Sequence, residues 1–161
     1  MALSAGDKIP DVTLRTPTED GPKPVQTATV LGSGTVVLFG VPGAFTPACS
    51  DTHLPGFVLR ADELKAKGVD TVACVSVNDA FVLDAWAKAR NADGAVLMLA
   101  DGNAEFAAAA GLEMDGSKFG LGTRSRRFAA VVTDGVVQWI GVEEVAGTVD
   151  VSGVESVLAQ L

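Results

Sequence analysis

Short runs of β-branched and other apolar residues alternate along the chain with stretches whose apolar positions recur every three or four residues. The first pattern predicts buried strands, and the second predicts amphipathic helices. Strands are expected at residues 9–14, 35–41, 69–77, 95–100, 128–132 and 136–140, and helices at residues 55–67, 80–89, 101–110 and 152–161. Residues 16–24, which are rich in Pro and Gly, are expected to form a loop.

Turn residues support several of these boundaries. Gly68 follows the first long helix at a position typical of a C-terminal cap. Asp134 and Gly135 separate the last two strands, and Asp-Gly between apolar runs predicts a hairpin. The order β-α-β-α-β-α-β-β-α predicts one α/β domain over residues 1–161, with a mixed central sheet flanked by helices. This order fits a thioredoxin-like fold, and it also fits other α/β sandwiches.

Composition and charge exclude several classes of protein. Of the 161 residues 48% are hydrophobic, and the net charge of −8 argues against nucleic acid or an anionic membrane as a partner. The longest apolar stretch, residues 36–45, contains two glycines and a proline and is shorter than the roughly 18 residues of a membrane helix. The first ten residues lack the basic and apolar regions of a secretion signal, so a cytoplasmic location is expected. Two Cys and one His predict no metal site.

Residues 41–57, VPGAFTPACSDTHLPGF, join the densest predicted strand to a helix and carry the candidate chemistry. Thr46 is a good N-cap and Pro47 a good first helical residue, which places Cys49 at the third position. Free N–H groups and the helix dipole favour an anion there, and the thiolate is the reactive form of cysteine. Pro55 is expected to break or kink the helix, so that Cys49 lies on a short turn of its own.

Each of these features also has a simpler interpretation. Cys49 could merely fill space, because free cysteines are often buried. Arg124, Arg126 and Arg127 could form a solvated edge, or one of them could supply a cation to the site. Strand alternation would point Arg126 and Arg127 to opposite faces, and the sequence alone does not choose between them.

Residues 42–49, PGAFTPAC, match the PxxxTxxC signature of peroxiredoxins. The longer run PGAFTPACSDTHLPGF resembles the peroxiredoxin-5 subfamily, which is also called type II or atypical. Residues 67–89, residues 119–137 and the closing VESVLAQL resemble the same subfamily, so the resemblance covers nearly the whole chain. It implies a thioredoxin-like fold and a thiol-dependent peroxidase that needs no cofactor.

The resemblance also implies roles for four residues. Cys49 would be the peroxidatic cysteine, whose thiolate attacks hydrogen peroxide or an alkyl hydroperoxide and becomes a sulfenic acid. Thr46 would hydrogen-bond the thiolate and the peroxide, and Pro42 would shield the sulfur from water. Arg127 would favour the thiolate and stabilise the charge that spreads along S–O–O in the transition state.

The second cysteine leaves open how Cys49 is reduced again. Cys74 could resolve Cys49 through an internal disulfide, or it could be a core thiol. A buried strand position would hold it beyond the few ångströms that a disulfide spans, so the core interpretation is favoured. Glutathione, glutaredoxin or thioredoxin would then reduce the sulfenic acid. For His53, a structural hydrogen bond is favoured over a role as a base.

Two other functions would use the same residues. A thiol–disulfide oxidoreductase is disfavoured because Thr46, and not a second cysteine, lies three residues before Cys49. A redox-sensing binding module would use Cys49 without turnover. The resemblance further implies a homodimer that covers the active-site loops, to which Phe45 and the segment at Phe119 would contribute.

Overall fold

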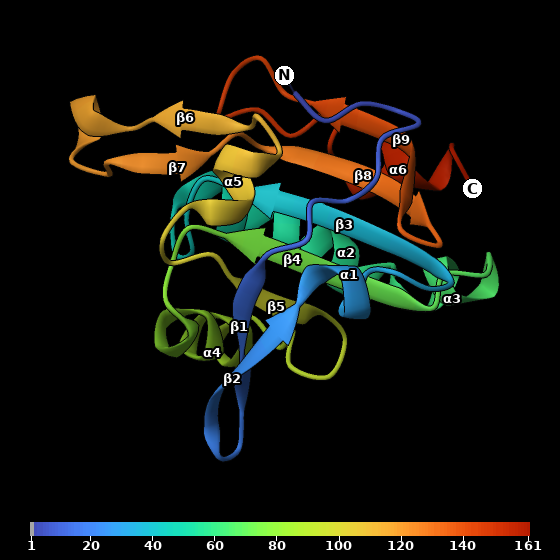
Figure 1. Cartoon of the computed structure of the whole chain (residues 1–161), viewed down its shortest axis with the longest axis horizontal. Coiled ribbons are helices and arrows are strands. Elements are labelled where there is room, and N and C mark those ends of the chain that lie inside the picture. Colours follow the sequence, from blue (N-terminus) through green and yellow to red (C-terminus); the bar gives the residue numbers. More distant parts are fainter. Residues whose placement is uncertain (1) are drawn as a thin grey trace.

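A computed structural model describes residues 2–161 of the chain (Figure 1). Seven strands form one sheet in the order β2-β1-β5-β4-β3-β8-β9. These strands are β1 (Thr13–Thr18), β2 (Gly21–Gln26), β3 (Thr35–Val41), β4 (Thr71–Ser76), β5 (Leu97–Ala100), β8 (Phe128–Thr133) and β9 (Val136–Val142). The helices are α1 (Thr27–Val30), α2 (Leu54–Leu59), α3 (Ala61–Ala66), α4 (Ala80–Ala89), α5 (Glu105–Ala109) and α6 (Val154–Leu158).

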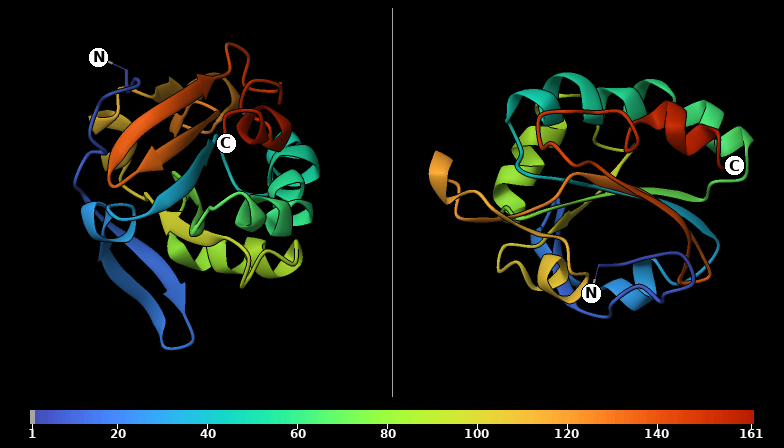
Figure 2. Two further views of the ribbon diagram at one scale, coloured as in Figure 1. Left: turned by 90° about the vertical axis from the view of Figure 1, so that its right-hand side faces the viewer. Right: turned by 90° about the horizontal axis from the view of Figure 1, so that it is seen from above.

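The sheet is mixed, as the element order predicted. Strands β3, β4 and β5 run parallel, and β8 and β9 continue the sheet antiparallel to β3. Helices α2, α3, α4 and α6 cover one face, while α1 and α5 lie on the other (Figure 2). This is the thioredoxin-like arrangement of a central mixed sheet flanked by helices. None of the helices within residues 2–161 is long and apolar enough to cross a membrane.

The apolar core is split into two clusters by the sheet. Alternation along β3 divides its residues, because successive side chains of a strand point to opposite faces. Phe39 packs with Phe57 and Trp86 on the face of α2 and α4, whereas Leu38 packs with Phe106 on the other face. Strand β3 is therefore buried on both faces, and the loop after Val41 starts from a fixed point in the core.

Two turns confirm boundaries that the sequence predicted. Asp134 and Gly135 have φ values of 49° and 80°, and positive φ at both central residues is the type I′ geometry of a tight hairpin. Gly68 has φ 95°, and its N–H bonds to the carbonyl of Lys65. The N–H of Val69 bonds to the carbonyl of Leu64, which completes a Schellman cap.

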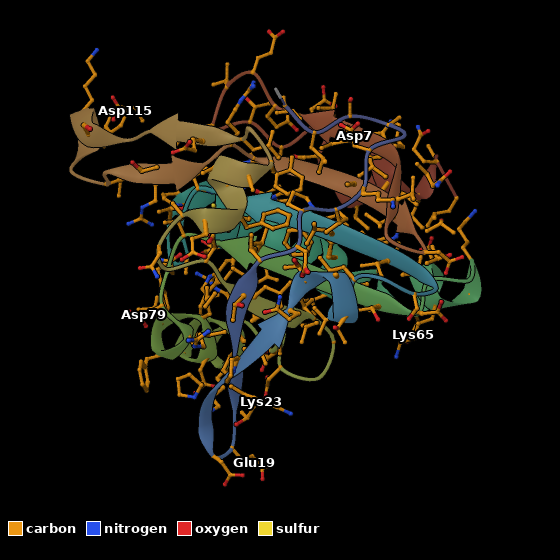
Figure 3. The ribbon with its side chains drawn as sticks, in the orientation of Figure 1. Asp7, Glu19, Lys23, Lys65, Asp79 and Asp115 are labelled. Atoms are coloured by element: carbon orange, nitrogen blue, oxygen red, sulfur yellow. The ribbon has the colours of Figure 1, made fainter. Side chains whose placement is uncertain are left out.

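Two hairpins were not predicted. The expected strand at residues 9–14 and loop at residues 16–24 are replaced by the β1–β2 hairpin, because an edge strand tolerates prolines that a central strand does not. Strands β6 (Glu113–Asp115) and β7 (Thr123–Ser125) form a separate pair beyond the sheet. Glu19 and Asp115 mark the projecting ends of the two hairpins (Figure 3). Helices α5 and α6 are shorter than the expected residues 101–110 and 152–161.

Candidate active site

The turn after β3 begins a helix at the predicted place. The N–H of Ser50 bonds to the carbonyl of Thr46 at 2.9 Å, so the Thr46 carbonyl accepts the first bond of the helix. Pro47 and Ala48 are helical, and Cys49 follows at the third position. Thr46 therefore lies at the N-cap position and Pro47 at the first helical position, as predicted, but the Thr46 hydroxyl bonds Gly43 and Cys49 Sγ and not a helix N–H.

The helix does not break at Pro55, so the expected separate turn for Cys49 is wrong; the helix is irregular just before the proline instead. Residues Cys49–His53 are π-helical and run directly into α2, which contains Pro55. The N–H of Leu54 bonds to the carbonyl of Cys49, five residues earlier, which is the wider turn of a π-helix. In a regular α-helix the ring of Pro55 would clash with the carbonyl four residues before it, and the wider turn changes the backbone at that place. The helix is interrupted later, at Arg60 (φ −106°, ψ 15°), between α2 and α3.

The Cys49 side chain is fully buried and lies between two polar side chains. Its Sγ is 3.0 Å from Thr46 Oγ1 and 3.1 Å from Arg127 Nη2. A guanidinium N–H can only donate, so the Arg127 contact places a positive donor directly on the sulfur. The interpretation of Cys49 as a space-filling core thiol does not explain these contacts.

The Thr46 hydroxyl has two neighbours and one proton. Its Oγ1 lies 2.6 Å from the carbonyl oxygen of Gly43 as well as 3.0 Å from Cys49 Sγ. While the sulfur is a thiol, Thr46 can donate to Gly43 and accept from S–H. Once the sulfur is a thiolate, the same hydroxyl can turn and donate to it.

Arg127 is the arginine of its cluster that reaches the sulfur. It is 2% exposed, and its Nε also donates to the Ala146 carbonyl at 2.9 Å. Arg126 donates to the Glu143 carbonyl, and Arg124 donates to the Pro42 carbonyl at 3.3 Å. All three guanidinium groups bond to backbone carbonyls, so the cluster is not a freely solvated edge.

His53 lies behind Arg127. Arg127 Nη1 donates to His53 Nδ1 at 2.9 Å, and His53 Nε2 lies 2.8 Å from the Ser152 carbonyl oxygen. Burial, and secondarily the charge of Arg127, lowers the pKa of His53 to about 3. Because both ring nitrogens are already engaged, the geometry favours the structural hydrogen-bonding role that the sequence predicted over a role as a base.

A cleft of about 680 Å³ opens beside Cys49. Pro42, Thr46 and Arg127 line it on the side of the sulfur. Sequence reasoning missed further lining residues, which are Met114, Phe119 and Leu121 near and within the β6–β7 hairpin and the Ala146–Gly147 segment. The apolar residues at 119 and 121 are a visible signal, which the sequence pattern connects only to a dimer interface.

Cys74 has a different environment. It is fully buried in β4 and belongs to the same apolar cluster as Cys49. Burial, together with the nearby Cys49, raises the pKa of the Cys74 thiol well above its ordinary value. Both cysteines are free thiols in this structure. No cluster of three or more His, Cys, Asp or Glu side chains that could hold a metal ion occurs within residues 2–161.

The chain is similar to known proteins over nearly its whole length. The Redoxin family model matches residues 4–158. The chain is 49% identical over 164 residues to peroxiredoxin-2E-2, chloroplastic, from Oryza sativa subsp. japonica, covering 99% of this chain and 72% of that one. It is 47% identical over 162 residues to peroxiredoxin-2C from the same organism, covering 99% and 98%. The crystal structure of reduced Prx3 from Vibrio vulnificus in complex with hydrogen peroxide superposes with a TM-score of 0.92 at 48% identity, covering 98% of both chains.

Proposed function

The chain belongs to the redoxin family and is a peroxiredoxin, a thiol-dependent peroxidase, and from this premise we propose that Cys49 is the thiol that attacks the peroxide. Its substrates are peroxides, and a thiol compound or protein reduces it afterwards. The observation that carries the assignment is the pair of contacts on the sulfur, from Arg127 Nη2 and Thr46 Oγ1.

The reaction begins with the Cys49 thiolate. A sulfur lone pair attacks one peroxide oxygen, the O–O bond breaks, and the other oxygen leaves as hydroxide or alkoxide, which takes up a proton. Sulfur is oxidised to a sulfenic acid and the peroxide is reduced to water or an alcohol. Charge spreads from sulfur to the leaving oxygen, and the Arg127 guanidinium stabilises it because its planar fork can reach both atoms.

Thr46 and Pro42 complete the proposed site. The Thr46 hydroxyl donates to the sulfur or to the incoming peroxide, according to which of them carries the negative charge. Pro42 lines the cleft beside Thr46, and its ring limits the access of water to the sulfur. Arg124 holds the Pro42 carbonyl at 3.3 Å and so fixes the position of this loop.

A single-turnover experiment tests the assignment. The reduced wild type and the variants Cys49→Ser and Cys74→Ser are mixed with hydrogen peroxide, and the remaining peroxide is measured over time. We expect fast consumption by the wild type and by Cys74→Ser, and none above background by Cys49→Ser. Fast consumption by Cys49→Ser would refute the role of Cys49. Oxidation of Cys49 without turnover in the presence of thiols would instead make the site a redox sensor.

We also propose that an external thiol reduces the Cys49 sulfenic acid. Cys74 is a protonated, apolar core thiol in β4, and the thiol form is a poor nucleophile. One thiol attacks the sulfenic acid to form a mixed disulfide and water, and a second thiol releases Cys49. Intact-mass analysis after one equivalent of peroxide distinguishes reduction by an external thiol from an internal disulfide with Cys74. A gain of one oxygen supports external reduction by glutathione, glutaredoxin or thioredoxin, whereas a loss of two hydrogens that Cys74→Ser abolishes makes Cys74 the resolving cysteine.

A homodimer that covers the rim of the cleft is proposed as well. Phe45 and Phe119 are 53% and 81% exposed and flank the site, and Phe45 is held at φ 64°, a costly conformation for an aromatic residue. Exposed aromatic side chains on active-site loops are typical of a protein interface. Light scattering at micromolar concentration tests this, and a monomer would contradict it.

A cytoplasmic location stays a prediction, which fractionation of the source cells would test.

A further inference from the structure

A chain of hydrogen bonds holds the side of the Arg127 guanidinium that faces away from Cys49. Arg127 Nη1 donates to His53 Nδ1, and His53 Nε2 lies against the Ser152 carbonyl. Arginine offers only donors and a carbonyl oxygen only accepts. Both contacts are satisfied together only when Nε2 carries the ring proton and Nδ1 offers its lone pair. The two neighbours therefore select one neutral tautomer of His53.

The loop from Glu143 to Ser152 supplies two of the carbonyls in this arrangement. Glu143 Oε2 accepts hydrogen bonds from the Asp150 N–H at 2.7 Å, the Ser152 N–H at 2.8 Å and the Ser152 hydroxyl at 2.7 Å. Burial by itself raises the pKa of Glu143, but these hydrogen bonds outweigh it and hold the pKa below its usual value. Glu143 thus closes the loop whose Ala146 and Ser152 carbonyls face Arg127 and His53.

We propose that His53 is a positioning residue of the peroxidase reaction and that Glu143 acts through it. With Nε fixed by Ala146 and Nη1 fixed by His53, the guanidinium plane cannot rotate, and Nη2 is left facing Cys49 Sγ. These contacts use three of the five N–H groups of arginine, so Nη2 keeps a second N–H for the peroxide oxygen. The inference rests on the proposed roles of Cys49 and Arg127.

The His53 ring is itself held in place by packing. Its centroid lies 5.0 Å from the ring of Phe39 and 5.6 Å from the ring of Phe57, and the residue is 1% exposed. In this apolar surrounding, a lost acceptor at Nδ1 leaves an N–H of Arg127 unpaired. The guanidinium would then turn toward another acceptor, and a displacement of about 1 Å at a reacting group can cost about 100-fold in rate.

Two substitutions of His53 separate positioning from packing. In His53→Asn, Oδ1 lies two bonds from Cβ, as Nδ1 does, and keeps an acceptor for Arg127. In His53→Gln, the amide lies one bond further and approaches the position of Nε2, so it can bond Ser152 but not Arg127. We expect the second-order rate constant for oxidation of Cys49 by hydrogen peroxide to stay within about threefold of wild type for Asn and to fall about 10- to 100-fold for Gln. Glu143→Gln is expected to lower it as well.

A measurement on the unmodified protein makes the test independent of how the variants fold. His53 is the one histidine of the chain, so the ¹⁵N signals of a labelled ring can be assigned without ambiguity. We expect a protonated Nε2 and an unprotonated Nδ1 throughout the neutral range, and a changed Nδ1 signal in Arg127→Lys. A proton on Nδ1, or a ring that becomes an imidazolium near its ordinary pKa of about 6.5, would overturn the proposal.

The rate constants of the two His53 variants also test the positioning role. Circular dichroism first establishes that His53→Asn and His53→Gln are folded. Equal rate constants for the two variants, whether both lowered or both unchanged, would overturn the positioning role. Cys49→Ser is measured beside them with the same hydrogen peroxide. If Cys49→Ser is inactive while the two His53 variants are alike, the role of His53 alone fails; if Cys49→Ser reacts as the wild type does, the proposed function itself fails.

Discussion

The two cysteines of this protein are equally buried and have different surroundings. The residue exposure of both Cys49 and Cys74 is 0%, and both belong to one apolar cluster on the same face of the sheet. Cys49 lies at a helix start with Thr46 and Arg127 on its sulfur, whereas Cys74 lies in the middle of β4. Two fully buried cysteines thus differ in whether their surroundings include donors that can hold a thiolate.

The largest expected effect separates the two cysteines by activity. Cys49→Ser should abolish peroxide reduction, because a serine hydroxyl is a far weaker nucleophile than a thiolate. Cys74→Ser should keep the wild-type rate of peroxide consumption. Steady-state consumption of hydrogen peroxide with an excess of a thiol reductant measures both. Equal loss of activity in the two variants would erase the functional difference between the two sites.

The neighbourhood of Cys49 should also make the fold sensitive to acid. The pKa of His53 is about 3 in the fold and about 6.5 in the unfolded chain, which therefore binds the additional proton between these values. Stability should be complete above pH ~6.5 and fall as the pH drops toward ~3, by about 5 kcal/mol at most. Urea titrations from neutral to acid pH measure the slope. His53→Asn, which lacks the titrating ring, serves as the control and should show a smaller slope. An unchanged slope in this variant would assign the acid sensitivity to other groups.

A third prediction concerns a substitution that weakens the hydrogen-bond donors around Cys49 and keeps its sulfur. Arg127→Lys keeps a positive charge but loses the planar fork that joins Cys49, His53 and Ala146. We expect the rate constant for peroxide reduction to fall about 100- to 1000-fold, as for loss of one preorganised donor in a transition state. Stopped-flow oxidation by hydrogen peroxide measures this. Arg60→Lys is the matched control, since Arg60 pairs with Glu63 and does not contact the sulfur. A similar loss in both variants would contradict the special role of Arg127.

The smallest expected effect is on stability, where Cys74→Ser should be more damaging than Cys49→Ser, the reverse of their effects on activity. Cys74→Ser places a hydroxyl in an apolar strand and should lower the free energy of unfolding by about 1–3 kcal/mol. Cys49→Ser puts its hydroxyl beside Arg127 and Thr46, which can hydrogen-bond it, and should cost less. Chemical denaturation of both variants measures the difference. A greater loss of stability in Cys49→Ser than in Cys74→Ser would contradict the assignment of Cys74 to the core.

The sequence predicted the elements that are governed by local patterns. The β-branched run at residues 35–41 coincides with β3, and Asp134-Gly135 forms the expected hairpin, because both depend on neighbouring residues. The β1–β2 hairpin was missed because its prolines are typical of a loop and are tolerated only at a sheet edge. The π-helical Cys49–His53 segment was missed because a π-turn has no clear composition of its own.

In the candidate site, too, features set by neighbouring residues were predictable and contacts between distant residues were not. The helix start at Thr46 and Pro47 followed from capping preferences, and it placed Cys49 correctly. The choice of Arg127 came from family resemblance, since three arginines lie within four residues and local alternation does not select one. The contacts from Arg127 to His53 and from His53 to Ser152 join residues far apart in the chain, and no local pattern encodes them.

The proposed reaction predicts which of the two sulfur atoms takes up the peroxide oxygen. Reduced protein is treated with one equivalent of hydrogen peroxide, sulfenic acids are trapped within seconds, and the modified peptides are identified by mass spectrometry. We expect trapping at Cys49 alone, and a strong loss of that trapping in Arg127→Lys. Trapping at Cys74 as fast as at Cys49, or trapping at Cys49 that is unchanged in Arg127→Lys, would contradict the proposed reaction.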